Sequence, residues 1–339
     1  MSIEIQADTI LIENAPDIPG LSFRRYRGKA DHHQITAVQN ACWRHDGLDW
    51  VQTVEETDNE YDHLVNCDPY EDMVFIEVNG ELVGFSQTNW CREIDGTYVY
   101  YAHGTLLPVW RRKGIGSAVL AYNEAHIREV ASAHSAEAPK VVRSGAYPEI
   151  EPHIAHLLEN AGYEPVRYWF KMSRPIDIPL PGAPMPPGLE VRPVKMKHAE
   201  AIFDAADEAL QDHWGHTPMT EEDRTAWLSH PDTDISLWKV AWDSDEVAGM
   251  VLNYVAHEEN KVMGRQRGYT EAISVRRPWR RRGLARALLV QSIQMFKDMG
   301  FEETALGVDA NNPNGALNLY EDVGYTVEKR LTVYQKPLA

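Results

Sequence analysis

The sequence predicts an α/β (α+β) fold built twice in tandem, each copy a mixed, mostly antiparallel sheet flanked by helices. Three observations predict it. The chain has 339 residues, more than one hydrophobic core usually supports. A proline-rich stretch at 174–188 interrupts the periodic segments near the middle. The same order of strand and helix patterns lies on both sides of it. We therefore expect an N-terminal domain over 1–174, a linker over 175–188 and a C-terminal domain over 189–339.

Hydrophobic periodicity defines the expected elements of the first half. Strands are expected over 21–26, 73–78, 81–89, 98–107, 141–143 and 163–172, and helices over 31–45, 50–64, 114–133 and 152–161. Asn79-Gly80 lies between two of these strands and is a strong hairpin signal. The first half therefore reads as a sheet with helices packed on both faces.

The second half repeats this order. Strands are expected over 189–193, 235–242, 247–255, 269–275, 304–308 and 325–335, and helices over 198–211, 221–229, 284–299 and 313–323. The last of these helices has signals at both ends. Asn311 or Asn312 can cap its start, Pro313 fits its first turn, and Gly324 occupies the C-cap position.

Composition excludes several classes of protein. The formal charge of -18 argues against a general nucleic-acid binder, and no apolar stretch is long enough to span a bilayer. Residues 1–8 have no secretory-signal pattern, so we expect a cytoplasmic protein, monomeric or homodimeric. Cys42, Cys67 and Cys91 lack metal-binding spacing and are interpreted as ordinary thiols, and we expect no metal site.

An arginine-rich turn joins the strand that ends at Val275 to the helix that begins at Leu284. Six arginines crowd this turn in an otherwise acidic chain: Arg276, Arg277, Arg280, Arg281, Arg282 and Arg286. A helix N-terminus presents unpaired N–H groups, and Gly283 keeps side chains out of their way, so the turn is suited to an anion such as the phosphates of coenzyme A. A similar turn over 106–117 occupies the same position in the first half.

Both turns resemble the acetyl-CoA-binding motif of the GNAT N-acetyltransferase superfamily, Val-x-Pro-x-x-(Gln/Arg)-x-x-Gly-x-(Gly/Ala). The first half departs only at Leu106, whereas the second has Arg277 where the family often has proline and carries Pro278 one place later. The resemblance covers both halves in element order. It implies cofactor-binding residues at Val275, Arg277, Arg280, Arg281, Arg282, Gly283, Leu284, Ala285 and Arg286, and at Leu106, Arg111, Arg112, Lys113, Gly114, Ile115, Gly116 and Ser117.

A second family motif, Asn-x-x-Ala-x-x-Leu-Tyr-x-x-x-Gly-(Phe/Tyr), resembles the segment that ends at Tyr325. Tyr320 takes the tyrosine position, where a phenol beside the sulfur can deliver a proton to the leaving thiolate. Pro313 replaces the asparagine, so Asn311 or Asn314 would supply the amide contact. A core tyrosine in an amphipathic helix is the alternative interpretation of Tyr320.

The first half has Leu158 where the second has Tyr320. We therefore interpret the N-terminal domain as a structural or regulatory copy without the acid, although Tyr147 could substitute for it. The C-terminal domain is expected to be the catalytic one.

Acetylation of an amine requires a group that takes the ammonium proton. Strand alternation places Tyr269, Glu271 and Ile273 on one face, leading to Val275, whose N–H is expected to polarise the acetyl carbonyl as in the family. Glu271 is the candidate base, although many family members have their glutamate at the position of Tyr269. A solvated strand carboxylate is the alternative.

Acceptor-binding residues are expected at the helix junction around residue 211–218, from Asp212, His213, Trp214 and His216, which capping and packing would explain equally well. The predicted function is transfer of acetyl from acetyl-CoA to a primary amine of a small molecule. The alternatives are a non-catalytic acyl-CoA sensor or scaffold and, against the net charge, a nucleic-acid-binding patch.

Overall fold

A computed structural model describes residues 8–338, so most of the segment 1–8, in which no secretory-signal pattern was found, lies outside the described part. The chain divides into two compact units. Unit 1 comprises 1–166 and 332–339, and unit 2 comprises 167–331. In the described residues, no helix is long and apolar enough to cross a membrane.

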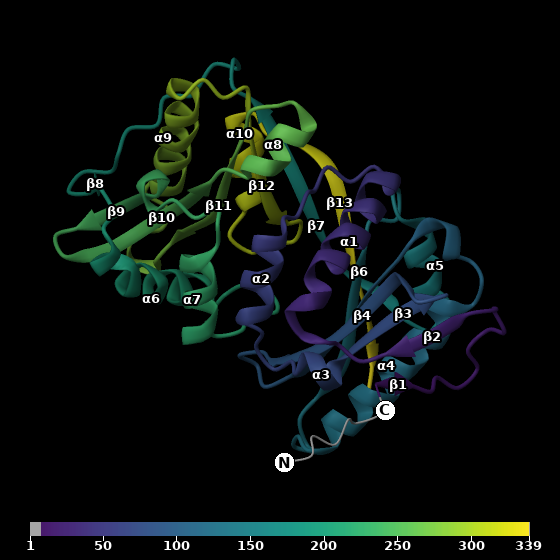
Figure 1. Cartoon of the computed structure of the whole chain (residues 1–339). Helices are drawn as coiled ribbons and strands as arrows, with labels where there is room; N and C mark the ends of the chain where they lie inside the picture. Colours follow the sequence, from purple (N-terminus) through teal and green to yellow (C-terminus); the bar gives the residue numbers. More distant parts are fainter. Residues whose placement is uncertain (1–7, 339) are drawn as a thin grey trace, which may run out of the picture. The chain divides into compact units, whose positions relative to one another are not determined.

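Unit 1 is a mixed sheet with helices packed against it (Figure 1). Its strands are β1 (Thr9–Ile10), β2 (Leu21–Arg24), β3 (Met73–Val78), β4 (Glu81–Arg92), β5 (Tyr98–Leu106) and β6 (Lys140–Ala146). Its helices are α1 (His32–Asp46), α2 (Val54–Asp62), α3 (Pro69–Asp72), α4 (Ile115–Ser132) and α5 (Pro152–Asn160). Only β5 and β6 pair in parallel; the other neighbours are antiparallel.

Unit 2 repeats this plan. Its strands are β8 (Glu190–Arg192), β9 (Lys239–Asp243), β10 (Glu246–Tyr254), β11 (Arg267–Val275) and β12 (Glu303–Asp309). Its helices are α6 (Ala199–Leu210), α7 (Glu221–Ser229), α8 (His257–Met263), α9 (Leu284–Asp298) and α10 (Ala316–Val323). Figure 1 shows α9 on one face of β9–β11 and α6 with α7 on the other. The predicted fold class is confirmed.

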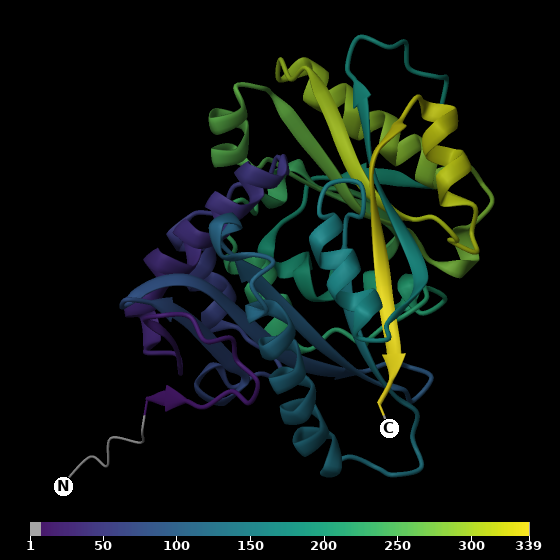
Figure 2. The ribbon, with the colours of Figure 1, turned by 90° about the vertical axis from the view of Figure 1, so that its right-hand side faces the viewer.

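The last strand of each half completes the sheet of the other unit. β7 (Glu164–Pro175) pairs antiparallel with β12 from Trp169 to Pro175. β13 (Thr326–Pro337), yellow in Figure 2, pairs antiparallel with β6 from Thr332 onward. The expected domain boundaries at 174 and 189 therefore differ from the unit boundaries. The reason is that the final strand segment of each half pairs within the other unit.

Three further details differ from the sequence-based expectation. Helix α10 begins at Ala316, not at 313, because Gly315 at its N-cap is left-handed (φ 74°) and no side chain caps it. Helix α8 was not expected. The alternation along β11 is broken by a bulge, since Met250 pairs with Ser274 but Leu252 pairs with Glu271, and Ala272 has φ 47°. Gly324 does close α10 in the left-handed conformation.

Candidate active site

The two arginine-rich turns have the same backbone conformation. Arg112 and Arg281 both adopt left-handed φ, 61° and 62°, and Gly114 and Gly283 follow with 90° and 84°. A non-glycine residue in this region is strained, and such strain gathers at functional sites. A Cβ on Gly283 would meet nothing within 4 Å, so the backbone conformation and not space requires glycine there. The repeat seen in the sequence is thus a repeat of geometry.

Each turn ends at the N-terminus of a long helix. The first helical hydrogen bonds run from the N–H of Ala118 to Gly114 O (3.1 Å) and from the N–H of Ala287 to Gly283 O (3.0 Å). The amides of residues 115–117 and 284–286 therefore have no acceptor within their helices. Amides in this position, at the positive end of the helix dipole, bind phosphate groups. The backbone at both turns is suited to phosphate groups.

The arginines of the turns divide into two groups. Arg280 donates from Nε to Val275 O (2.9 Å) and pairs with Asp212 (2.7 Å), and Arg111 donates to Leu106 O (2.8 Å) and pairs with Asp46 (2.6 Å). These guanidinium groups tie the turn to its own strand and to the preceding helix. By contrast, Arg281, Arg282 and the corresponding Arg112 and Lys113 are exposed.

Other basic residues of the second turn also have protein partners. Arg276 pairs with Glu208 (2.7 Å), and Arg286 of α9 pairs with Asp322 of α10 (2.7 Å). Arg277 pairs with Asp212 (2.6 Å). Hydrogen bonds from Arg277 and then Arg280 lower the pKa of Asp212 below its usual range. Asp212, expected in the acceptor site, thus anchors the turn.

In each unit, the two parallel strands pair only at their first residues and separate toward the end that leads into the turn. The β11–β12 ladder joins 267–269 to 303–305, and the β5–β6 ladder joins 98–101 to 140–143; in the described chain each ladder stops there. Beyond these pairs, the two strands no longer form a ladder with each other. The bulge at Ala272 lies on the diverging part of β11.

Glu271 lies on the same part of β11, beyond the ladder with β12. The N–H of Gly307 on β12 donates to its Oε1 (3.0 Å). Burial raises the pKa of Glu271 to about 7, although the Gly307 hydrogen bond and the charge of Lys171 both lower it. A carboxyl with a pKa near the working pH is suited to act as a general base.

Tyr320 is buried on α10 and packs edge-on against Tyr325, with ring centroids 6.3 Å apart. Burial, and then the charge of Glu271, raise the pKa of Tyr320 well above its ordinary value. The phenol is therefore protonated at neutral pH and close enough to Glu271 to sense its charge.

The residues of the predicted acceptor cluster have different partners in the structure. His213 lies 3.4 Å from Asn312, and burial lowers its pKa. Trp214 lies under the guanidinium of Arg167 (5.5 Å), which pairs with Asp309 (2.6 Å). The Nε2 atom of His216 lies 3.3 Å from Oδ1 of Asp207.

The two asparagines proposed for the amide contact lie in the loop before α10. The N–H of Asn311 donates to Asp309 Oδ1 (3.0 Å), and the N–H of Asn314 donates to Asn312 Oδ1 (2.8 Å). His213, Trp214 and this loop therefore share one end of β12.

In unit 1, the position of Tyr320 holds Leu158, which is buried in the core. Tyr147 is also buried; burial raises its pKa to about 12, and its ring meets Trp50 edge-on at 5.4 Å. Tyr147 therefore lies directly after β6, and its ring packs against Trp50.

Strand register also identifies a residue that sequence reasoning missed. Gly84 pairs with Leu106 in unit 1 as Gly249 pairs with Val275 in unit 2. Three residues along, Gln87 pairs with His103, and Leu252 pairs with Glu271. His103 is thus the counterpart of Glu271. A residue count alone selects Ala102, because the bulge is present only in the β11 ladder.

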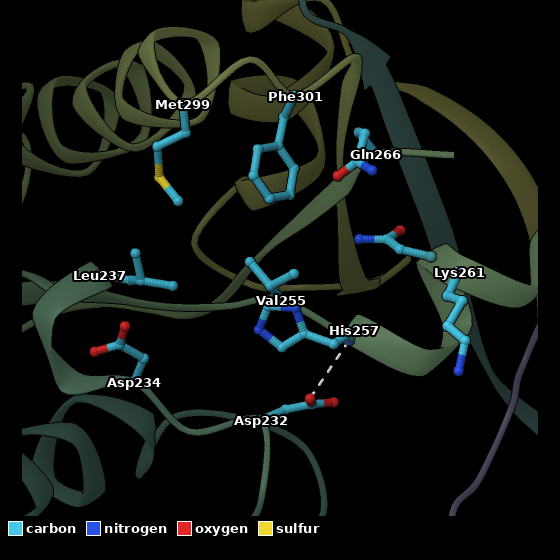
Figure 3. A pocket seen from close by; sticks show the side chains of 10 residues that line it. Asp232, Asp234, Leu237, Val255, His257, Lys261, Gln266, Met299 and Phe301 are labelled. Atoms are coloured by element: carbon cyan, nitrogen blue, oxygen red, sulfur yellow. Dashed lines mark hydrogen bonds between the residues drawn. The ribbon is translucent and has the colours of Figure 1, made fainter. Parts of the chain in front are cut away.

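A cavity of about 370 Å³ lies in unit 2 at the C-terminal end of α9 (Figure 3). Leu237, Val255 and Phe301 form its apolar wall, and Asp232, Asp234 and His257 lie at its polar side. The phosphate turn lies at the other end of this 15-residue helix, about 22 Å away along its axis. None of the predicted site residues lines the cavity.

The chain is similar in sequence to known acetyltransferases. The Acetyltransferase (GNAT) family profile matches residues 33–142 and 199–325. The mycothiol acetyltransferase of Catenulispora acidiphila is 27% identical over 236 residues, which are 69% of this chain and 71% of that protein. The Salinispora tropica mycothiol acetyltransferase is 26% identical over 250 residues, covering 73% and 75%.

Solved structures are similar over nearly the whole chain. A GCN5-related N-acetyltransferase from Sphaerobacter thermophilus has a TM-score of 0.70 and 27% identity, covering 95% of this chain and 96% of that one. A tandem GNAT protein from the clavulanic acid biosynthesis pathway has a TM-score of 0.67 and 12% identity, covering 94% and 99%. The second likeness concerns the fold alone.

Proposed function

Because the chain belongs to the Acetyltransferase (GNAT) family, we propose that its unit 2 transfers the acetyl group of acetyl-CoA to a primary amine of a small molecule. One observation supports the assignment to unit 2: Tyr320 occupies the position that Leu158 has in unit 1, and Glu271 accepts a hydrogen bond from Gly307 on the neighbouring strand β12.

Coenzyme A would be held at the second turn. The amides of residues 284–286 would receive its phosphates, with the exposed Arg281 and Arg282 beside them. Its pantetheine arm would enter the gap between β11 and β12, where the N–H of Val275 would polarise the acetyl carbonyl. Asn311 and Asn314 lie in the loop that faces this end of the sheet.

Glu271 and Tyr320 would move the protons. Glu271 would take the proton of the acceptor amine, because an ammonium has no lone pair with which to attack. Tyr320 would deliver a proton to the thiolate that leaves, whose conjugate acid has a pKa of about 8.5. His213 and Trp214 would contact the acceptor from the helix junction. The relatives named mycothiol acetyltransferase support a small-molecule acceptor.

Unit 1 is proposed to bind acetyl-CoA at its own turn, through residues 106–117, without catalysing transfer. The turn geometry supports binding, and Leu158 supports the absence of an acid. Non-catalytic binding of acyl-CoA by both units, as a sensor or scaffold, is the competing function.

A thiol-release assay separates these functions. With acetyl-CoA and a library of amines, Glu271→Gln and Tyr320→Phe should each lower turnover by roughly 10²-fold or more, with acetyl-CoA binding retained. Glu321→Gln, an exposed carboxyl next to Tyr320, is the matched control for Glu271→Gln. Tyr325→Phe, which removes a buried hydroxyl bonded to Thr304 (2.8 Å), is the control for Tyr320→Phe. Unchanged turnover in both test variants would refute the assigned roles, and no thiol release from the wild type with any amine would favour the sensor.

A further inference from the structure

Strand β7, from the first half of the sequence, brings a lysine into the candidate site of unit 2. Residues 169–175 of β7 form a ladder with β12, in which Lys171 pairs with Gly307. The N–H of Gly307 is the donor to Glu271 Oε1 (3.0 Å). Lys171 is therefore the residue directly across the ladder from the contact that holds Glu271.

The side chain of Lys171 lies on the same face of the sheet as Glu271. Its Nζ is 3.5 Å from the hydroxyl of Tyr269 and 5.6 Å from the centroid of that ring. Tyr269 and Glu271 are two residues apart on β11, before the bulge at Ala272, so strand alternation points both to one face. The ammonium and the carboxyl thus share a half-buried region.

The other titratable groups around Glu271 are phenols or already have partners. Tyr254 of β10 stacks on Tyr269 with centroids 4.8 Å apart, and Tyr320 and Tyr325 belong to α10 and its C-terminal end. Glu259 of α8 accepts from Tyr269 (2.5 Å) and pairs with Arg265. Lys171 is the cation whose charge acts on Glu271, and it opposes the effect of burial.

We propose that Lys171 is a positioning residue that keeps Glu271 ionised, and so able to accept the proton of the acceptor amine. The inference rests on the proposed role of Glu271. A buried carboxyl without a nearby cation favours its protonated form, which cannot act as a base. The site of unit 2 is then complete only with a strand from the first half of the chain.

Carbon-13 NMR tests the proposal without an acceptor. In protein labelled at the glutamate carboxyl carbons, the Glu271 signal is the one missing from Glu271→Gln. Lys171→Met should move the titration midpoint of this signal upward by about one pH unit, because a favourable charge is lost. Lys171→Arg keeps the charge and should restore the wild-type midpoint. Lys261→Met, at an exposed lysine paired with Glu258 (3.0 Å), should leave it unchanged.

An unchanged midpoint in Lys171→Met would overturn the proposal. Lys171→Gln serves as a second neutral variant if Lys171→Met does not fold, as judged by thermal unfolding. The acid limb of the thiol-release pH profile should shift in the same direction as the midpoint. If Glu271→Gln leaves thiol release intact, the proposed role of Glu271 as the base fails, while the titration still decides what Lys171 does to Glu271.

Discussion

At the scale of single residues, the proposed roles require Glu271 to be deprotonated and Tyr320 to be protonated at the same pH. Burial raises the pKa of Glu271 to about 7 and that of Tyr320 well above its ordinary value. A base must be deprotonated and an acid protonated before each can act. The two residues are in these states together only between the two pKa values.

This pairing predicts the pH dependence of transfer. Acetylation should fall tenfold per pH unit as the pH drops below about 7, because protonated Glu271 cannot accept a proton. The opposite limb, from Tyr320, should lie above the ordinary tyrosine pKa of about 10. The measurement is kcat/KM for acetyl-CoA as a function of pH, at a saturating concentration of the amine. A profile flat from pH 5 to 8 would contradict the role of Glu271.

The sequence predicted which residue types gather at the site better than it predicted their partners. Tyr320 and Glu271 could be found from spacing and a family motif. The ion pair between Arg280 and Asp212 could not be predicted, because it joins residues 68 positions apart in the chain. His103 was missed for a different reason. The bulge in the β10–β11 ladder, which the β4–β5 ladder lacks, changes which residue of β5 corresponds to Glu271. Local patterns do not encode either relation.

At the scale of elements, the two turns have the same backbone geometry, but Tyr320 is present in the unit of the second turn and Leu158 takes its position in the unit of the first. We predict that Arg281→Glu with Arg282→Glu raises the KM for acetyl-CoA by roughly 10-fold or more, because two exposed cations at the phosphate site become anions. The matched variant, Arg112→Glu with Lys113→Glu, should leave kcat and KM nearly unchanged.

Calorimetry with acetyl-CoA gives the complementary measurement for these variants. Each double variant should lose one of two binding sites. Equal loss of turnover in both double variants would show that the two units cannot be assigned separate roles.

Most elements could be predicted from periodicity, and the exceptions have local causes. Helix α8 has seven residues, HEENKVM, too short and too polar to show an apolar face. The start of α10 was placed early because Pro313 fits a first helical turn, yet the left-handed Gly315 defers the helix to Ala316. In both cases a turn conformation, not a hydrophobic pattern, sets the boundary.

At the scale of the whole molecule, the exchanged strands make the sequence halves interdependent. In unit 1, residues 332–337 of β13 cover the edge of β6, and the buried Tyr334 belongs to the core of that unit. In unit 2, residues 169–175 of β7 cover β12 and include the buried Met172. A sequence pattern shows that a strand exists but not which edge it joins, so the exchange could not be predicted.

Cutting the chain tests this dependence. We predict that fragments 1–182 and 183–339, expressed separately, do not unfold cooperatively, because each lacks a strand that closes its sheet. Co-expressed, they should copurify and regain thermal unfolding and acetyl-CoA binding. An isolated 183–339 fragment that melts cooperatively and binds acetyl-CoA would contradict the prediction.

A smaller truncation locates the effect within one unit. Deleting 332–339 should lower amide-exchange protection in β6 at the amides that face β13, whereas deleting 338–339 should retain it, because the ladder from Thr332 to Pro337 remains.

The exchanged strand also sets an order of events on the ribosome. Unit 1 begins at the N-terminus, yet its sheet awaits Pro337, which is made 171 residues after Val166. At about 5–20 residues per second, this delay is roughly 10–30 s. During that time the edge of β6 in the nascent chain lacks its β13 partner, so unit 1 can complete its sheet only after nearly the whole chain has been made.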